Sequence, residues 1–214
     1  MNSEEGYQNL RRFLYGRWAV EAALAGVQLP QEQGTSFQMD MRLAIRGLSV
    51  VMSEQTTEHW CPIMLADGST TLVRTFLLDP IDHPDDVAVA SRQMRYTITL
   101  RIFRVRDTNG IFDFSNSIEQ VPLWSDALIV DVEPGQDGNG LDAHAVWNSA
   151  LPGASQNPAS IPDQLPAGAA EPLKFQLDGQ TLVASVDLPP TVLAAGLLGG
   201  QAVLRLTVSP RPAP

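Results

Sequence analysis

Apolar residues near the start of the chain recur at spacings of three and four. This period places them on one face of a helix, which we predict over residues 3–26. Asn2 or Ser3 is suited to cap its first turn, and Gly26 to end it. We therefore expect residues 1–30 to form a helical arm that packs on its own domain or docks on a neighbouring subunit. The face consists of Tyr7, Leu10, Leu14, Trp18, Ala22 and Ala25.

Beyond this segment the period changes to two. Phe37, Met39 and Met41 alternate with polar residues, as in a strand with one buried and one wet face. A slip of the later alternation at Ile102-Phe103 indicates a bulge or a strand that changes sheets. Similar patterns predict strands over residues 54–65, 70–79, 94–106, 126–134 and 201–210, hairpin turns at Asn109-Gly110 and Asp178-Gly179, and a short helix from Pro190.

Residues 133–172 interrupt this pattern with proline, glycine, alanine and serine. We interpret them as a long loop insert that Trp147 and Leu151 partly order. Because the strands otherwise follow one another with short turns, the sequence predicts a mainly β fold, either an antiparallel β-sandwich or an open barrel. Residues 31–214 would form this single β-rich domain, preceded by the N-terminal α-helix.

The composition is typical of a globular chain. Of its 214 residues 44% are hydrophobic, and no apolar run is long enough to cross a bilayer as a helix. The single cysteine can form neither an internal disulfide nor a cysteine-rich zinc site. We expect a soluble, cytoplasmic protein, and the many alanine, glycine and proline residues suggest a GC-rich bacterial or phage source.

Charge is distributed unevenly along this acidic chain, whose net charge is −10. Residues 91–106 carry five arginines and no acid, whereas residues 107–172 carry ten acids and neither lysine nor arginine. The arginines either pair with acidic neighbours in the fold, which we favour, or form a basic face for an anionic partner. We do not expect a nucleic acid partner, because the net negative charge repels phosphates.

The stretch TTEHWCPIML combines the cysteine with a histidine. Cys61 is a candidate nucleophile, with His59, His83 or His144 as candidate bases. The alternative is a small apolar residue in an ordinary strand, with Pro62 marking a sheet edge or a bulge. We favour the second interpretation, because a catalytic base usually comes from elsewhere in the fold. The chain also has no G-x-S-x-G, P-loop, H-E-x-x-H or paired C-x-x-C motif.

The glycine-containing stretch QDGNGLDAH is a candidate cation site. Its oxygen ligands could wrap calcium, but no glutamate stands at the closing position of an EF-hand. A transition metal would need a second histidine, such as His83 or His59, close to His144. We therefore expect a solvated turn, with neither metal nor cofactor. The potential ligands are Asp137, Asn139, Asp142 and His144.

These features lead to three functions, in decreasing order of preference. The first is a non-catalytic structural or assembly protein, a subunit of a larger complex that acts through protein–protein contacts or self-association and not on a membrane. The second is a ligand-binding β module for a carbohydrate or a calcium-dependent partner. The third is a small hydrolase-like enzyme that uses Cys61 or a histidine–carboxylate site. The predicted contact residues are Tyr7, Leu14, Trp18, Trp60, Arg101, Arg104 and Arg106.

Overall fold

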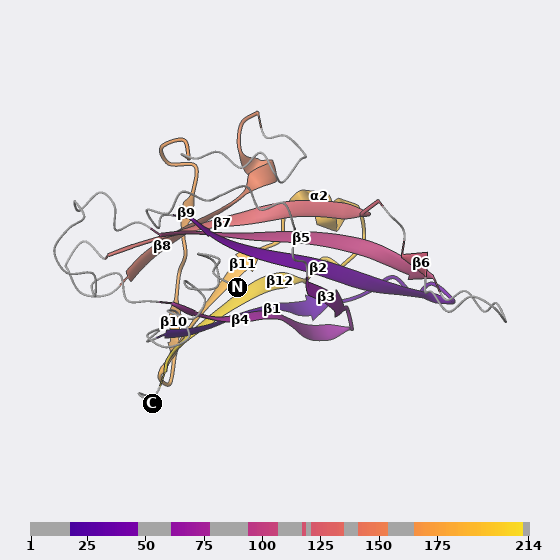
Figure 1. Ribbon diagram of the computed structural model, residues 1–214, viewed down its shortest axis with the longest axis horizontal. Helices are drawn as coiled ribbons and strands as arrows, with labels where there is room; N and C mark the ends of the chain where they lie inside the picture. The colour runs from indigo at the N-terminus through magenta and orange to yellow at the C-terminus, as the bar shows by residue number, and fades with distance from the viewer. Residues whose placement is uncertain are drawn as a thin grey trace, which may run out of the picture.

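The chain folds mainly into β-strands. They form two antiparallel sheets, one of five strands and one of seven, and within the described ranges neither sheet closes into a barrel (Figure 1). This is the mainly β architecture that the alternating pattern predicts. The computed structural model describes residues 18–46, 61–77, 94–106, 117–118, 121–134, 141–153 and 165–211.

The five-stranded sheet is built around β1, which bonds to a strand on each side. Alternate residues of β1 face the other sheet, while Glu21 points away and pairs with Arg74 of β4 at 2.6 Å. The strands run in the order β10 (Gln176–Asp178), β11 (Thr181–Asp187), β12 (Val203–Pro210), β1 (Trp18–Val27) and β4 (Gly68–Leu77).

The seven-stranded sheet has the short strand β3 at one edge. Pro62 lies in this strand, which is at a sheet edge among the described strands; a sheet edge, where the missing N–H of proline is tolerated, is one of the two positions predicted for it. The strands run in the order β3 (Cys61–Met64), β2 (Thr35–Arg46), β5 (Met94–Arg106), β7 (Trp124–Pro134), β8 (Leu141–Trp147) and β9 (Glu171–Pro172), and β6 (Ser117–Ile118) pairs with β5.

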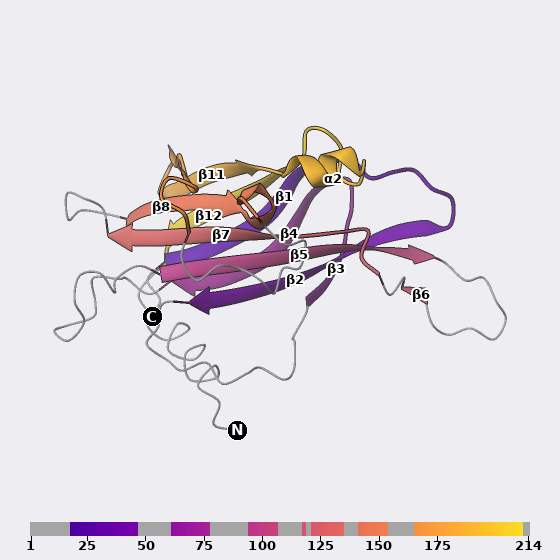
Figure 2. The same cartoon turned by 90° about the horizontal axis from the view of Figure 1, so that it is seen from above.

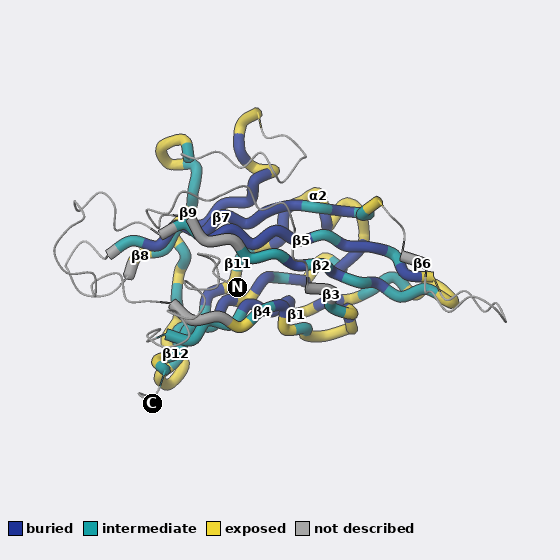
Figure 3. Tube along the Cα trace, in the orientation of Figure 1, coloured by how far each residue is buried: buried dark blue, intermediate teal, exposed yellow. Residues whose placement is uncertain are grey.

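The two sheets pack face to face around one main core (Figure 2). Leu24 and Leu204 of the five-stranded sheet belong to the same buried cluster as Leu100 and Leu128 of the seven-stranded sheet, and all four are fully buried. Buried residues are concentrated along the central strands of both layers (Figure 3). The core is therefore made by the inward-facing half of each strand, as the period of two requires.

One end of this core is tightly filled, and we call it the closed end. It lies where β1 ends, and the short helix α2 (Pro190–Ala194) contributes Val192 to it (Figure 2). Val192 and Leu198 are completely buried there, and the backbone N–H of Gln28 donates to the carbonyl of Leu198 at 2.9 Å. Helix α2 begins at the proline that the sequence predicts as its start.

Two tryptophans join the layers near the closed end. The indole N–H of Trp124 in β7 donates to the hydroxyl of Thr191 in α2 at 3.0 Å. The indole N–H of Trp147 in β8 donates to the carbonyl of Asp187 in β11 at 2.8 Å. The two rings meet edge to face with centroids 6.2 Å apart. Both side chains are buried, as we expect of core anchors.

The helix predicted over residues 3–26 is wrong from residue 18 onward, where the chain forms β1. Residues 3–17 lie outside the described part. Alanine favours a helix by itself, but β1 gains hydrogen-bonded partners on both sides and buries alternate side chains, and these tertiary interactions outweigh the propensity. Gly26 ends no helix. It lies at a register shift between β1 and β4, with φ of 70°.

The loop insert predicted over residues 133–172 is wrong in its central part. There residues 141–147 form β8, followed by a short 3-10 helix, η3 (Asn148–Ala150). The strand is hard to detect because two of its inward positions, Ala143 and Ala145, are alanines with little apolar signal. Trp147 and Leu151 are both buried, as expected of residues that order this segment.

Strands β2 and β5 keep the period of two, whereas β4 breaks it at a register shift against β1, where Leu72 belongs to the main core and Val73 packs against it. The register between β2 and β5 runs without a shift from Arg46–Arg95 to Thr35–Arg106, so the bulge or change of sheet predicted at Ile102-Phe103 is wrong. Both faces of β5 are covered here, and the guanidinium of Arg101 lies 5.3 Å from the ring centre of Phe103 on the outer face. The Asn109-Gly110 turn lies outside the described residues.

Candidate functional site

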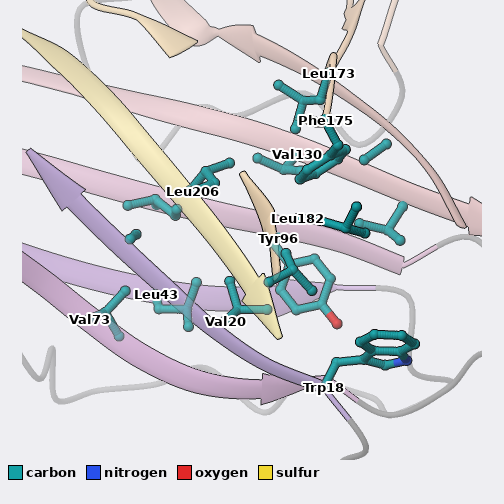
Figure 4. A pocket seen from close by; sticks show the side chains of 15 residues that line it. Trp18, Val20, Leu43, Val73, Tyr96, Val130, Leu173, Phe175, Leu182 and Leu206 are labelled. Atoms are coloured by element: carbon teal, nitrogen blue, oxygen red, sulfur yellow. The ribbon is translucent and has the colours of Figure 1, made fainter. Parts of the chain in front are cut away.

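An apolar cleft opens between the two sheets where β1 and β5 begin, at the end opposite α2 (Figure 2), and its lining is shown in Figure 4. We call this end the open end. The cleft has a volume of about 190 Å³. Fifteen side chains from both sheets and from the β9–β10 connection line it: Trp18, Val20, Ala22, Leu43, Val73, Tyr96, Ile98, Val130, Val132, Ala143, Leu173, Phe175, Leu182, Leu206 and Val208.

The cleft has a buried floor and a half-buried rim. Ala22, Ile98 and Leu206 on its floor are at most 5% exposed, whereas Trp18 and Leu43 are partly exposed at its rim. None of the described lining residues carries a charged group at neutral pH. The Tyr96 hydroxyl and the Trp18 indole nitrogen lie on the same side of the cleft (Figure 4). The arrangement suits an apolar group with its polar part on that side.

The cleft exists because short side chains occupy inward positions in both layers. Ala22 of β1 and Ala143 of β8 line it, and neither reaches far into the space between the sheets. At the closed end the inward positions carry larger side chains, such as Leu24 and Phe37, which fill that space. The same alternation of strands thus produces a dense core at one end and a void at the other.

The arginine-rich strand β5 is paired with acidic neighbours. The guanidinium of Arg95 contacts Asp131 of β7 at 2.6 Å, within a pair that is almost buried. Two further pairs, Arg101–Asp40 at 3.3 Å and Arg104–Glu32 at 3.5 Å, join β5 to β2 and to the chain before β2. These three contacts confirm, for Arg95, Arg101 and Arg104, the interpretation that the arginines pair with acids within the fold.

The predicted contact residues that the structure describes do not gather in one place. Trp18 lines the cleft, whereas Arg106 is exposed at the far end of β5, in register with Ser117 of β6. Arg101 and Arg104 likewise belong to β5 and are not among the residues that line the cleft. Tyr7, Leu14 and Trp60 lie outside the described residues, as do His59 and His83.

The proposed nucleophile and cation ligands are only partly described. In β3 the backbone of Cys61 pairs with Met41 of β2, and the side chain of Cys61 is outside the description. Asp142 and His144 lie in β8 rather than in a glycine loop, and Nδ1 of His144 is 3.8 Å from a carboxylate oxygen of Glu133. Asp137 and Asn139 are not described. Among the described side chains no three metal-ligating groups come together.

Asp126 is a buried carboxylate that the sequence does not reveal. It accepts hydrogen bonds from the backbone N–H groups of Ala127 and Ser149, at 2.7 and 3.2 Å, and from the Ser149 hydroxyl. Burial raises the pKa of Asp126 above its ordinary value of 3.8, and these three hydrogen bonds oppose the rise without cancelling it. The carboxylate holds η3 against β7 and is not among the residues that line the cleft.

The cleft itself is the feature that sequence reasoning missed. Alternation identifies inward-facing residues on each strand, but it does not show where facing side chains fail to meet. The alanines at inward positions of β1 and β8 were the available signal, and the helix predicted over the first of them and the loop over the second concealed it.

Comparisons with known proteins identify no relative. No family model, curated protein or solved structure matches this chain. In the part of the chain that the structure describes, no helix has the length and apolar character needed to cross a membrane. The function must therefore be inferred from the cleft and its surroundings.

Proposed function

We propose that this protein is a non-catalytic β-sandwich module that acts by binding, and that its binding site is the apolar cleft at the open end. The observation that carries this proposal is a partly open space of about 190 Å³ lined by fifteen apolar or aromatic side chains from both sheets. The free energy of binding is favourable when an apolar group displaces poorly hydrogen-bonded water from such a space.

The rim supports the same proposal. An apolar residue at a cleft edge, such as Leu43 or Val73, gains little from its neighbours while it is partly exposed to water. A bound apolar group would bury these side chains further, at about 25 cal/mol for each Å² of apolar surface removed from water. The free energy of binding would then come from contact area and not from a charged anchor.

A dye that fluoresces in apolar surroundings tests this proposal. We expect N-phenyl-1-naphthylamine, an uncharged probe, to bind the wild-type protein saturably with a stoichiometry of one. Ala22→Leu places additional carbon atoms on the cleft floor and should weaken dye binding at least tenfold. Ala19→Leu makes the same change on the opposite face of β1 and should leave binding unchanged. Absence of a saturable signal, or equal binding by the two variants, would contradict the proposal.

A role in assembly is the second candidate, and the edge of the five-stranded sheet favours it. Strand β4 is ten residues long, and within the described ranges no strand pairs with its outer edge. A long edge strand can accept a strand from another chain or another copy. Sedimentation velocity over a hundredfold range of concentration tests self-association through this edge. A monomer of 23.2 kDa at every concentration would exclude it.

A further inference from the structure

The volume of the cleft sets the size of the group that it can hold. A cavity of about 150 Å³ in another protein accommodates benzene, which corresponds to about 25 Å³ for each non-hydrogen atom. On this scale the 190 Å³ of the cleft correspond to about seven or eight non-hydrogen atoms. A longer molecule would leave its remaining atoms at the rim, in water.

The lining sets the charge of the ligand. A carboxylate or an ammonium group inside the cleft would lose its hydration and find no opposite charge among the lining side chains. The ionisable residues of β1 and its neighbours, such as Glu21 and Arg74, pair on the outer face of the five-stranded sheet. The group that enters the cleft must therefore be uncharged.

The position of the two polar atoms sets the orientation of the ligand. The Tyr96 hydroxyl and the Trp18 indole nitrogen lie on one side of the cleft, and Trp18 is on the partly exposed rim (Figure 4). The opposite wall and the floor carry aliphatic side chains, such as Val130 and Leu206. A hydroxyl or carbonyl group at one end of a ligand would thus lie on the side of Tyr96 and Trp18, and the hydrocarbon part of the ligand would be directed inward.

We propose that the cleft binds a small, free, uncharged amphiphile, with a hydrocarbon part of about seven or eight carbon atoms and one hydroxyl or carbonyl group. This inference rests on the proposed function and narrows it to one class of ligand. A polypeptide is the less favoured occupant, because its backbone N–H and C=O groups would lie against a rim made mostly of aliphatic and aromatic side chains.

A series of straight-chain alcohols tests the size and the charge of the ligand. Titrations from 1-butanol to 1-decanol, followed by amide chemical shifts, should show affinity rising about fourfold for each methylene. The rise should stop near eight carbon atoms, when the cleft is full. At neutral pH, octanoate and octylammonium should bind at least tenfold more weakly than 1-octanol, because each would bring an unpaired charge to the apolar lining.

The cleft-filling variant gives a second, independent measurement. Ala22→Leu adds three carbon atoms to the floor, so the rise should stop about three methylenes earlier, near five carbon atoms. Ala19→Leu, on the other face of β1, should follow the wild-type series. The wild-type series tests the inference by itself if the filled variant does not fold.

The outcomes separate this inference from the proposed function. If the affinity rises evenly through 1-decanol, the proposed size limit of about eight carbon atoms is wrong. If octanoate binds with the same affinity as 1-octanol, the requirement for an uncharged group is wrong. Dye binding without alcohol binding overturns the inference and leaves the proposed function standing, whereas failure of both contradicts the two together. N-acetyl-phenylalanine amide binding more tightly than 1-octanol would replace the free amphiphile by a polypeptide side chain.

Discussion

The closed and open ends of the same two sheets differ in how completely their inward side chains meet. At the closed end Leu24, Val192 and Leu198 are fully buried, and α2 lies beside the sheets. At the open end Trp18 and Leu43 remain partly exposed around a void. One pattern of alternation produced both, so the difference comes from the sizes of the side chains and from α2. We expect the closed end to contribute more to the stability of the fold, and the proposed binding function uses the space that the open end leaves unfilled.

Matched leucine truncations should show the largest difference between the ends. Leu24→Ala removes a fully buried side chain and leaves a closed cavity, so we expect a loss of about 3 kcal/mol in the free energy of unfolding. Leu43→Ala enlarges a cleft that water already reaches and should cost about 1 kcal/mol. Urea unfolding at 25 °C measures both. Equal losses would show that the two ends are packed alike.

Two glycines at the closed end test how tightly its backbone is packed. Gly26 and Gly34 both have positive φ, 70° and 65°, but a Cβ on Gly26 would lie 2.5 Å from the carbonyl oxygen of Gln201, whereas one on Gly34 would have no neighbour within 4 Å. Gly26→Ala should therefore cost about 2 to 3 kcal/mol, from strain and from displacement of the backbone. Gly34→Ala should cost about 1 kcal/mol, from strain alone. Thermal and urea unfolding of both variants provide the test, and a smaller loss for Gly26→Ala would refute it.

Enlarging an alanine should have opposite effects at the two ends. Ala202 is 4% exposed and belongs to the main core, so Ala202→Val should cost about 1 to 2 kcal/mol through overpacking. Ala22→Val extends into the cleft and should stabilise the fold by about 0.5 kcal/mol. Urea unfolding of the two variants measures whether the free energy of unfolding falls for Ala202→Val and rises for Ala22→Val. A loss at Ala22 as large as that at Ala202 would mean that the cleft is already filled.

The smallest expected effect concerns pH. Burial raises the pKa of Asp126 in the folded state, so the protonated carboxyl favours folding below its ordinary pKa of 3.8. This contribution is lost as the pH rises through the higher, folded-state pKa. The amide introduced by Asp126→Asn carries no ionisable proton, so the stability of this variant relative to the wild type should increase as the pH rises from 3.8. Urea unfolding of both proteins across this pH range measures the change. A stability difference between them that is independent of pH would contradict this.

The sequence predicted the period of the strands better than their partners. Strands such as β2 and β5 have strong inward residues at every second position, and this local signal was enough to find them. The inward residues of β1, such as Trp18 and Ala22, fit both the period of two of a strand and the spacing of four of a helix. The strand forms because β1 pairs with partners that are more than forty residues away in the sequence. Local propensity could not weigh those distant hydrogen bonds.

The candidate site was harder to predict for the same reason. Its lining comes from strands spread between Trp18 and Val208, so no short motif describes it. The features that drew notice in the sequence, the arginines of β5 and the stretch around Cys61, are conspicuous because of rare or charged residues. A void depends instead on what small residues such as Ala143 leave unfilled, which becomes visible only when the two layers are placed together.

The indole hydrogen bonds of Trp124 and Trp147 have a mechanical consequence. They join one layer to the other near α2, whereas the described lining of the cleft consists of apolar and aromatic side chains from both layers. Thermal fluctuations in the distance between the two layers should therefore be small near α2 and increase toward the open end. The cleft would then widen to admit a ligand while the two indole hydrogen bonds stay formed, so ligand entry would not require the protein to unfold.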